Sequence, residues 1–133
     1  MPSASTITIN DRETTPVAHV FTYGGEDANG VNVFVNNTSD LIAGRERLTV
    51  STRQSAGKHR VKIVLTDPVT ATETVNGVSV PRVTRTAYAD LSLTFDELST
   101  LQERKNVIGM LENMLKTTQT ALDAVLTNAE SFY

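Results

Sequence analysis

Two hydrophobic periods divide the chain near residue 95. Before this point, apolar and polar residues alternate, which is the period of a β-strand with one buried face. The alternating stretches are 5–10, 17–23, 30–37, 47–54, 58–66 and 83–95. After Phe95, apolar residues recur every three or four positions, as in an amphipathic helix. Strands followed by helices predict an α+β fold with an antiparallel sheet.

The first helix has a start signal and an apolar stripe. Ser99 with Gln102, or Thr100 with Glu103, would form a capping box at its N-terminus. The stripe consists of Arg104, Val107, Ile108, Leu111, Met114 and Leu115. A second, shorter helix is predicted over about 118–129, with Ala121, Leu122, Val125 and Leu126 on its stripe. Two such helices can cover only part of one sheet face, so the pattern favours a dimer that exchanges helices.

Residues 67–82 carry several turn signals between two strands. Pro68, the Asn76-Gly77 pair and Pro81 interrupt the alternation. This composition predicts a long loop or flap, and an ordinary surface loop is the simpler alternative. With 133 residues, 39% of them apolar, the chain is predicted to form one domain, 1–133, with a light core.

Charge is distributed unevenly along the chain. Residues 45–62 hold six cations and one acid, a net charge of +5 within an overall charge of −3. Strand alternation places the polar and basic residues of 47–54 on one face and those of 58–66 on one face of the next strand. These residues are Arg47, Thr49, Ser51 and Arg53, then Lys58, Arg60 and Lys62. The asymmetry predicts a basic surface for an anionic partner, although a merely solvated face has the same pattern.

Other chemistry is sparse in the sequence. The chain has no cysteine, and neither His19 nor His59 forms a recognisable motif with the carboxylates. We therefore predict no catalytic residues, no metal site and no cofactor. The N-terminus lacks the basic and apolar regions of a secretory signal, and no apolar run approaches a membrane span. These features predict a soluble protein made in the cytoplasm, without a membrane partner.

One long segment resembles a known family. "VTRTAYADLSLTF" at 83–95, followed by "STLQERKNVIGML" at 99–111, resembles the coat protein of single-stranded RNA bacteriophages, the leviviruses. Shorter matches follow the order of the family. They are "DRETTP" (11–16), "ANGV" (28–31), "LTVSTRQS" (48–55) and "TETVNGVSVP" (72–81).

The resemblance implies a fold and an assembly. It implies an N-terminal hairpin and a five-stranded antiparallel sheet within 1–95, followed by two dimerising helices within 96–133. Two chains would interlock so that their sheets join, and dimers would form a T=3 icosahedral shell in the host cytoplasm. The inner sheet face would bind genomic RNA, including a stem-loop at the replicase start, and thereby repress translation and mark the genome for packaging. The phage maturation protein would be a further partner in the virion.

The resemblance also assigns roles to residues. Arg53, Lys58, Arg60 and Lys62 would contact phosphates, with Arg47 on the same face. Tyr88 would stack on an unpaired base, although packing across strands is the commoner use of a strand tyrosine. Asp90 would accept a hydrogen bond from a base amino group, or alternatively pair with a neighbouring Arg or Lys.

The resemblance also implies a pocket for an unpaired nucleotide base and a loop whose shape varies within the shell. Val31, Thr49, Ser51 and Lys62 correspond to a pocket that takes an unpaired adenine in some members. Here Arg60 stands where a small hydroxyl residue occurs in that pocket, and the turn at 54–59 is shorter than in some relatives. Both departures weaken any transfer of hairpin specificity. The flap residues that would change shape between five-fold and quasi-six-fold vertices are Asn76, Gly77 and Pro81.

Two rival functions make different predictions. A cellular RNA- or DNA-binding β-module would have the same charged face but would form no particle. A small enzyme on an α+β scaffold would need a concave site with converging acids or bases, and the sequence contains no such pattern.

Overall fold

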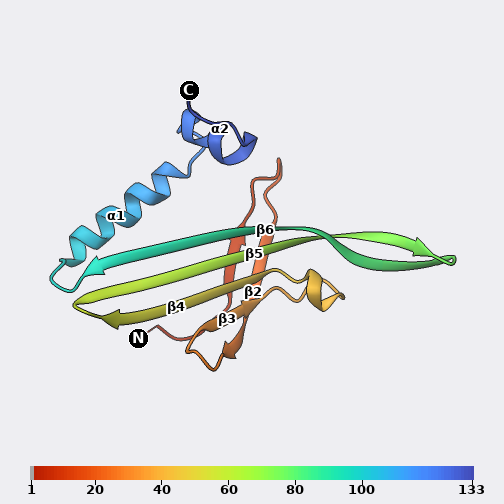
Figure 1. The fold of residues 1–133 in the computed structure, drawn as a ribbon, viewed down its shortest axis with the longest axis horizontal. Coiled ribbons are helices and arrows are strands. Elements are labelled where there is room, and N and C mark those ends of the chain that lie inside the picture. Colours follow the sequence, from red (N-terminus) through yellow and green to blue (C-terminus); the bar gives the residue numbers. More distant parts are fainter. Residues whose placement is uncertain (1) are drawn as a thin grey trace. The chain divides into compact units, whose positions relative to one another are not determined.

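The computed structural model describes residues 2–133 and confirms the predicted α+β class (Figure 1). Six strands form one sheet in chain order, and two helices follow. The strands are β1 (Ile7–Asn10), β2 (Ala18–Glu26), β3 (Asn32–Val35), β4 (Arg47–Ser55), β5 (Lys58–Val75) and β6 (Val78–Asp96). The helices are the 3-10 helix η1 (Ile42–Gly44), α1 (Leu101–Met114) and α2 (Thr120–Asn128). The chain divides into two compact units, one ending at Thr94 and the other spanning Phe95–Tyr133.

The second strand joins the N-terminal hairpin to the rest of the sheet. Its first half pairs with β1, with Ile7 opposite Phe21, and its second half pairs with β3. The register shifts between Tyr23 and Gly25, and Gly25 has a φ of 106°, which favours glycine. Such a bulge bends and twists a strand. In Figure 1, β2 accordingly runs across the direction of β4, β5 and β6.

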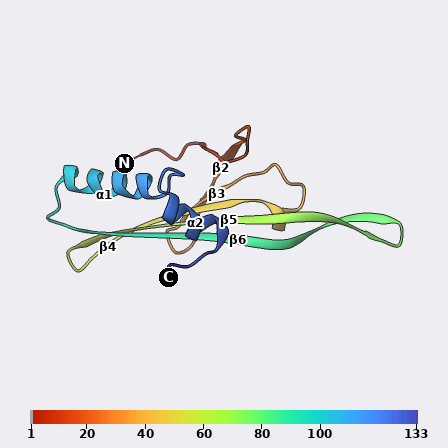
Figure 2. The same ribbon diagram turned by 90° about the horizontal axis from the view of Figure 1, so that it is seen from above.

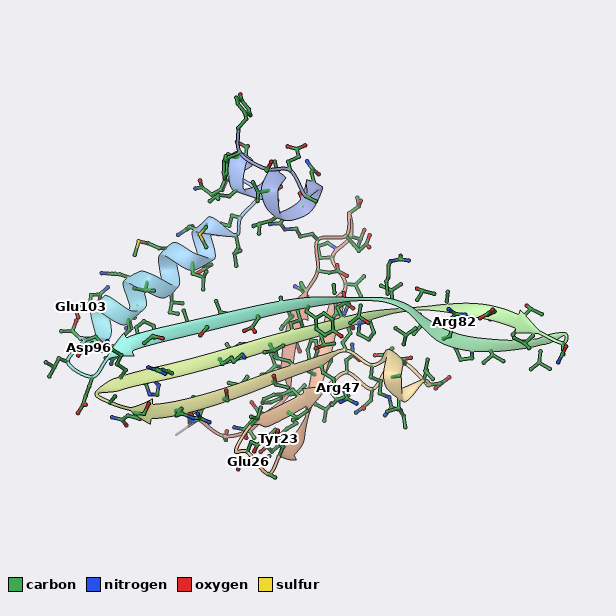
Figure 3. All side chains as sticks on the ribbon, viewed as in Figure 1. Tyr23, Glu26, Arg47, Arg82, Asp96 and Glu103 are labelled. Carbon is green, nitrogen blue, oxygen red and sulfur yellow. The ribbon has the colours of Figure 1, made fainter. Side chains whose placement is uncertain are left out.

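The core lies where this hairpin meets the sheet. Phe21 of β2, Phe34 of β3 and Leu48 of β4 are buried, with Phe21 only 1% exposed. Partly buried side chains surround them, namely Ile7, Val50, Ile63 and Leu65. The ring of Tyr23, labelled in Figure 3, lies 5.3 Å from that of Phe34 between centroids. The predicted apolar faces of β4 and β5 therefore contribute to the core, through Leu48 and Val50 of β4 and Ile63 and Leu65 of β5.

The predicted loop over 67–82 is wrong. Instead, β5 continues to Val75 and β6 begins at Val78, so the segment is a two-stranded ribbon extending beyond β4 (Figure 1). Thr84 Oγ1 donates to the carbonyl of Val69, and Arg82 forms a 2.7 Å ion pair with Glu73. Figure 3 labels Arg82 on this ribbon.

Pro68 and Pro81 do not break the ribbon because few neighbouring strands form hydrogen bonds with it there. The pairing of β4 with β5 ends at Arg47 and Thr66, before Pro68. Pro81 lies in β6, the last strand of the sheet. Proline lacks a backbone N–H and is tolerated on such edges. Asn76 and Gly77 form the two-residue turn, with φ of 52° and 78°, as a type I′ hairpin requires.

The helical unit begins as predicted. Thr100 Oγ1 accepts from the Glu103 N–H, and Glu103 Oε2 accepts from the Thr100 N–H, which is a capping box. Figure 2 shows α1 and α2 as separate helices joined by a short turn. Neither helix contains a buried residue.

Candidate nucleic-acid interface

The pairing of β4 with β5 sets which side chains share a face. Arg53 lies directly opposite Arg60, Ser51 opposite Lys62 and Ser55 opposite Lys58. Directly opposite residues of antiparallel strands project to the same side. Thr49 and Arg47 follow by alternation along β4, whereas Leu48 and Val50 face the core. The predicted basic face is therefore continuous across both strands, as the alternation indicated.

The Arg53–Arg60 pair has no electrostatic benefit by itself. Like charges directly opposite each other destabilise an antiparallel pair. Neither guanidinium has an ion-pair partner among the salt bridges of residues 2–133. An anion bound between the two would relieve this repulsion, so the arrangement suits a phosphate.

A shallow depression of about 280 Å³ adjoins this pair. Five predicted site residues line it, namely Val31, Ser51, Arg53, Arg60 and Lys62. The loop before β3 closes one side through Asn29 and Gly30, and Ser92 of β6 also contributes. These last three residues are not among the predicted site residues. Alternation does put Ser92 on the face of Tyr88 and Asp90, and the family resemblance includes the segment 28–31, but no local pattern indicates that Asn29 lies beside β4 and β5.

The remaining predicted residues lie outside the depression. Thr49, which was predicted to share a pocket with Val31, does not line it, and neither do Arg47 and Lys58. They stay on the basic face by strand register. Figure 3 labels Arg47 on β4.

Tyr88 and Asp90 extend the same face onto β6. The Lys62 Nζ lies 3.6 Å from Asp90 Oδ2, which places Asp90 on the side of the basic residues. This is the ion pair of the alternative interpretation, but both side chains are 57% exposed, so it contributes at most about 1 kcal/mol. Tyr88 is 73% exposed, so within one chain its ring is largely available for stacking.

His19 differs from the sequence-based expectation. Its two ring nitrogens contact Asp11 and Glu46, each at 2.8 Å, although no motif was recognised. These residues are 8 and 27 positions from His19, which is too far for a local pattern to reveal.

The residues that the structure describes can also be searched for metal-binding groups and membrane-spanning helices. Within residues 2–133, no group of three or more histidine and acidic side chains could hold a metal ion. None of the helices described is long and apolar enough to cross a membrane.

Comparison with known proteins shows which family has this fold. The family model "Levivirus coat protein" matches residues 2–133. The chain belongs to the levivirus coat protein family. The capsid protein of Pseudomonas phage PRR1 is 32% identical over 128 residues, 96% of each chain. Membership confirms the resemblance and supports a role as a capsid protein of an RNA phage.

Solved structures agree with this assignment. The virus-like particle of Beihai levi-like virus 21 has a chain 27% identical to this one, with a TM-score of 0.82 over 99% of both chains. The virus-like particle of bacteriophage ESE058 has the same fold, with a TM-score of 0.87 at 24% identity, covering 99% of this chain and 100% of that one. The family match argues against the rival interpretation as a cellular binding module.

Proposed function

We propose that this levivirus coat protein dimerises, assembles into a T=3 icosahedral shell and binds genomic RNA on its basic sheet face. One observation carries the RNA-binding part, namely the cross-strand pair of Arg53 and Arg60 beside Lys62. Each cation that neutralises a phosphate releases condensed counterions, which favours binding to any RNA sequence. A dimer would present this surface twice.

Exposed apolar side chains on α1 support dimerisation. Val107 and Ile108 of α1 are 39% and 43% exposed although they lie on its apolar stripe. A partner chain would cover such apolar surface.

Sequence-specific binding would add to this general attraction. Tyr88 would stack on an unpaired loop base of a stem-loop at the replicase start, and Asp90 would accept from a base amino group. The depression beside Val31 and Ser51 would receive a second nucleotide. Binding there would repress translation and select the genome for packaging.

The family resemblance suggests how the shell is completed and where it assembles. The ribbon that turns at Asn76-Gly77 would meet other copies at the shell vertices, with Pro81 in its second strand. The maturation protein would be a further partner in the virion, and assembly would take place in the host cytoplasm.

The first test is assembly. We expect the protein, expressed alone in a bacterium, to give uniform icosahedral particles in electron micrographs. Its ultraviolet absorbance should show packaged RNA. A monomer or dimer that added RNA does not assemble would refute the shell.

The second test separates RNA contact from folding. Arg60→Gln should reduce the slope of log affinity against log salt, for a short single-stranded RNA, by about 0.7 for one lost phosphate contact. Arg85→Gln is the matched control, because alternation along β6 puts Arg85 on the opposite face from Tyr88. Equal slopes for both variants would contradict the assigned face.

The third test concerns Tyr88. RNA hairpins selected from a random-loop pool against the wild-type protein provide a ligand. Loss of one stacked base contributes about 1–3 kcal/mol, so Tyr88→Ala should bind them roughly 5- to 150-fold more weakly. Particles should still form. Unchanged hairpin affinity would mean that Tyr88 has no stacking role.

A further inference from the structure

His19 lies between two carboxylates from separate segments of the chain. Its Nε2 is 2.8 Å from Asp11 Oδ2, in the connection between β1 and β2, and its Nδ1 is 2.8 Å from Glu46 Oε1, just before β4. An ionised carboxylate can only accept hydrogen bonds, and a neutral imidazole has only one N–H donor. Both contacts are satisfied together when His19 carries two protons. The ring then joins the N-terminal hairpin to the start of β4.

Other hydrogen bonds hold the two carboxylates in position. Asp11 Oδ1 accepts from the backbone N–H groups of Glu13 and Val17, at 3.1 and 2.9 Å. Glu46 Oε1 also accepts from Asn36 Nδ2 at 2.9 Å. Both acceptors are therefore oriented independently of the imidazole, which favours the geometry seen.

The surroundings of His19 are acidic. A cavity of about 430 Å³ adjoins the ring, and its titratable lining consists of Asp11, Glu13, His19, Glu46 and Asp67. Asp67 of β5 follows Thr66, which pairs with Arg47, so Asp67 lies across from Glu46. Arg12, next to Asp11 in the segment between β1 and β2, is the positively charged residue of that segment. The His19 side chain is 29% exposed, so its protons can exchange with solvent.

Proton affinities agree with this geometry. Hydrogen bonds that His19 donates to Asp11 first and to Glu46 second raise the pKa of His19 to about 9. Backbone hydrogen bonding from Val17, followed by the His19 contact, lowers the pKa of Asp11 to about 2. Burial first, and then the charge of Glu46, raise the pKa of Asp67.

We propose that protonated His19 is a pH-sensitive clasp that holds the N-terminal β1–β2 hairpin to the sheet, and that alkaline pH opens it. Removing the proton leaves Asp11, Glu46 and Asp67 close together without the imidazolium. One hydrogen-bond donor is lost, and the like charges repel each other. Buried Phe21 and the pairing of β2 with β3 still attach the hairpin to the sheet, so opening is local.

The direction of the pH effect follows from linkage. A group whose pKa is raised by folding stabilises the folded state fully below its unfolded value, here 6.5, and this contribution is lost as pH rises through about 9. Asp11 acts oppositely, because its contribution is present above 3.8 and is lost as pH falls to about 2. Asp67 has a raised pKa, so its charge disfavours folding and acid relieves that cost. The clasp is therefore strongest between about pH 3.8 and pH 6.5, where Asp11 is ionised and His19 is protonated.

Hydrogen exchange, followed by mass spectrometry on the full-length protein, tests the clasp. Protection factors for β1 (Ile7–Asn10) are compared with those for β4 from about pH 5 to about pH 10. For wild type, we expect β1 protection to fall by up to about tenfold for each pH unit between 6.5 and 9, while β4 protection stays constant. His19→Gln should show low β1 protection with no such transition. His59→Gln, which changes the other histidine of the chain, should behave as wild type.

A second variant keeps the test decisive if His19→Gln fails to fold. Glu46→Gln retains a side-chain oxygen that can accept from His19 and Asn36 but removes the negative charge. We expect it to move the β1 transition to lower pH. The proposal is overturned if wild-type β1 protection is independent of pH, or if Glu46→Gln leaves the transition unchanged.

Discussion

The turn between β4 and β5 contains a conformation that its sequence does not favour. Ala56 and Gly57 have φ of 52° and 73°, nearly the values of Asn76 and Gly77, which are 52° and 78°. Both are two-residue hairpin turns of type I′, in which asparagine is preferred at the first position. The chain thus contains the same turn twice, once with asparagine and once with alanine.

The difference between the turns sets the size of the expected effect. A residue with a Cβ in the left-handed region costs about 1–2 kcal/mol, and asparagine reduces this cost through local hydrogen bonds. Ala56→Asn should therefore increase the free energy of unfolding by about 1 kcal/mol. For a domain of this size, that corresponds to a rise in Tm of about 4 °C.

Thermal unfolding monitored by circular dichroism provides the assay. Asn76→Ala is the reciprocal variant and should lower Tm by a similar amount. Register should not change, so Arg53 and Lys58 on either side of the turn keep their positions and RNA affinity stays the same. A lower Tm for Ala56→Asn, or a higher Tm for Asn76→Ala, would refute the assignment of equivalent turns.

Three further predictions test packing and capping. Gly44→Ala should destabilise the fold by about 1–3 kcal/mol, because a Cβ there would overlap the Thr70 methyl group, whereas Gly109→Ala in the open interior of α1 should stabilise it by about 0.5–1 kcal/mol. Equal effects in denaturant titrations would contradict this. Phe21→Ala, at the most buried core position, should lose about 3–5 kcal/mol, and a loss below 1 kcal/mol would rule out the assigned core. Thr100→Ala should remove about 1 kcal/mol from the α1 cap, and unchanged Tm would argue against it.

Some features of this protein depend only on neighbouring residues, and the sequence by itself determined them. Strand alternation placed Arg53 and Lys62 on the face opposite Leu48, and the observed register agrees. The capping box at Thr100 and Glu103 fixed where α1 begins. Side chains alternate along any strand, and a cap spans four residues, so both signals are local.

Other features depend on which distant segments meet, and only the tertiary structure decided them. Residues 67–82 form a ribbon because β5 and β6 pair there beyond the end of β4, which leaves the prolines on strands with few partners. The depression forms where the loop at Asn29 approaches β4 and β5. His19 becomes a bridge only when the hairpin folds onto the sheet and brings Glu46 within 2.8 Å. The depression and the His19 bridge join residues far apart in the chain, so no pattern of neighbouring residues could encode them. The ribbon has a local signal in its Asn76-Gly77 turn, but only the structure shows that its two strands continue beyond the end of β4.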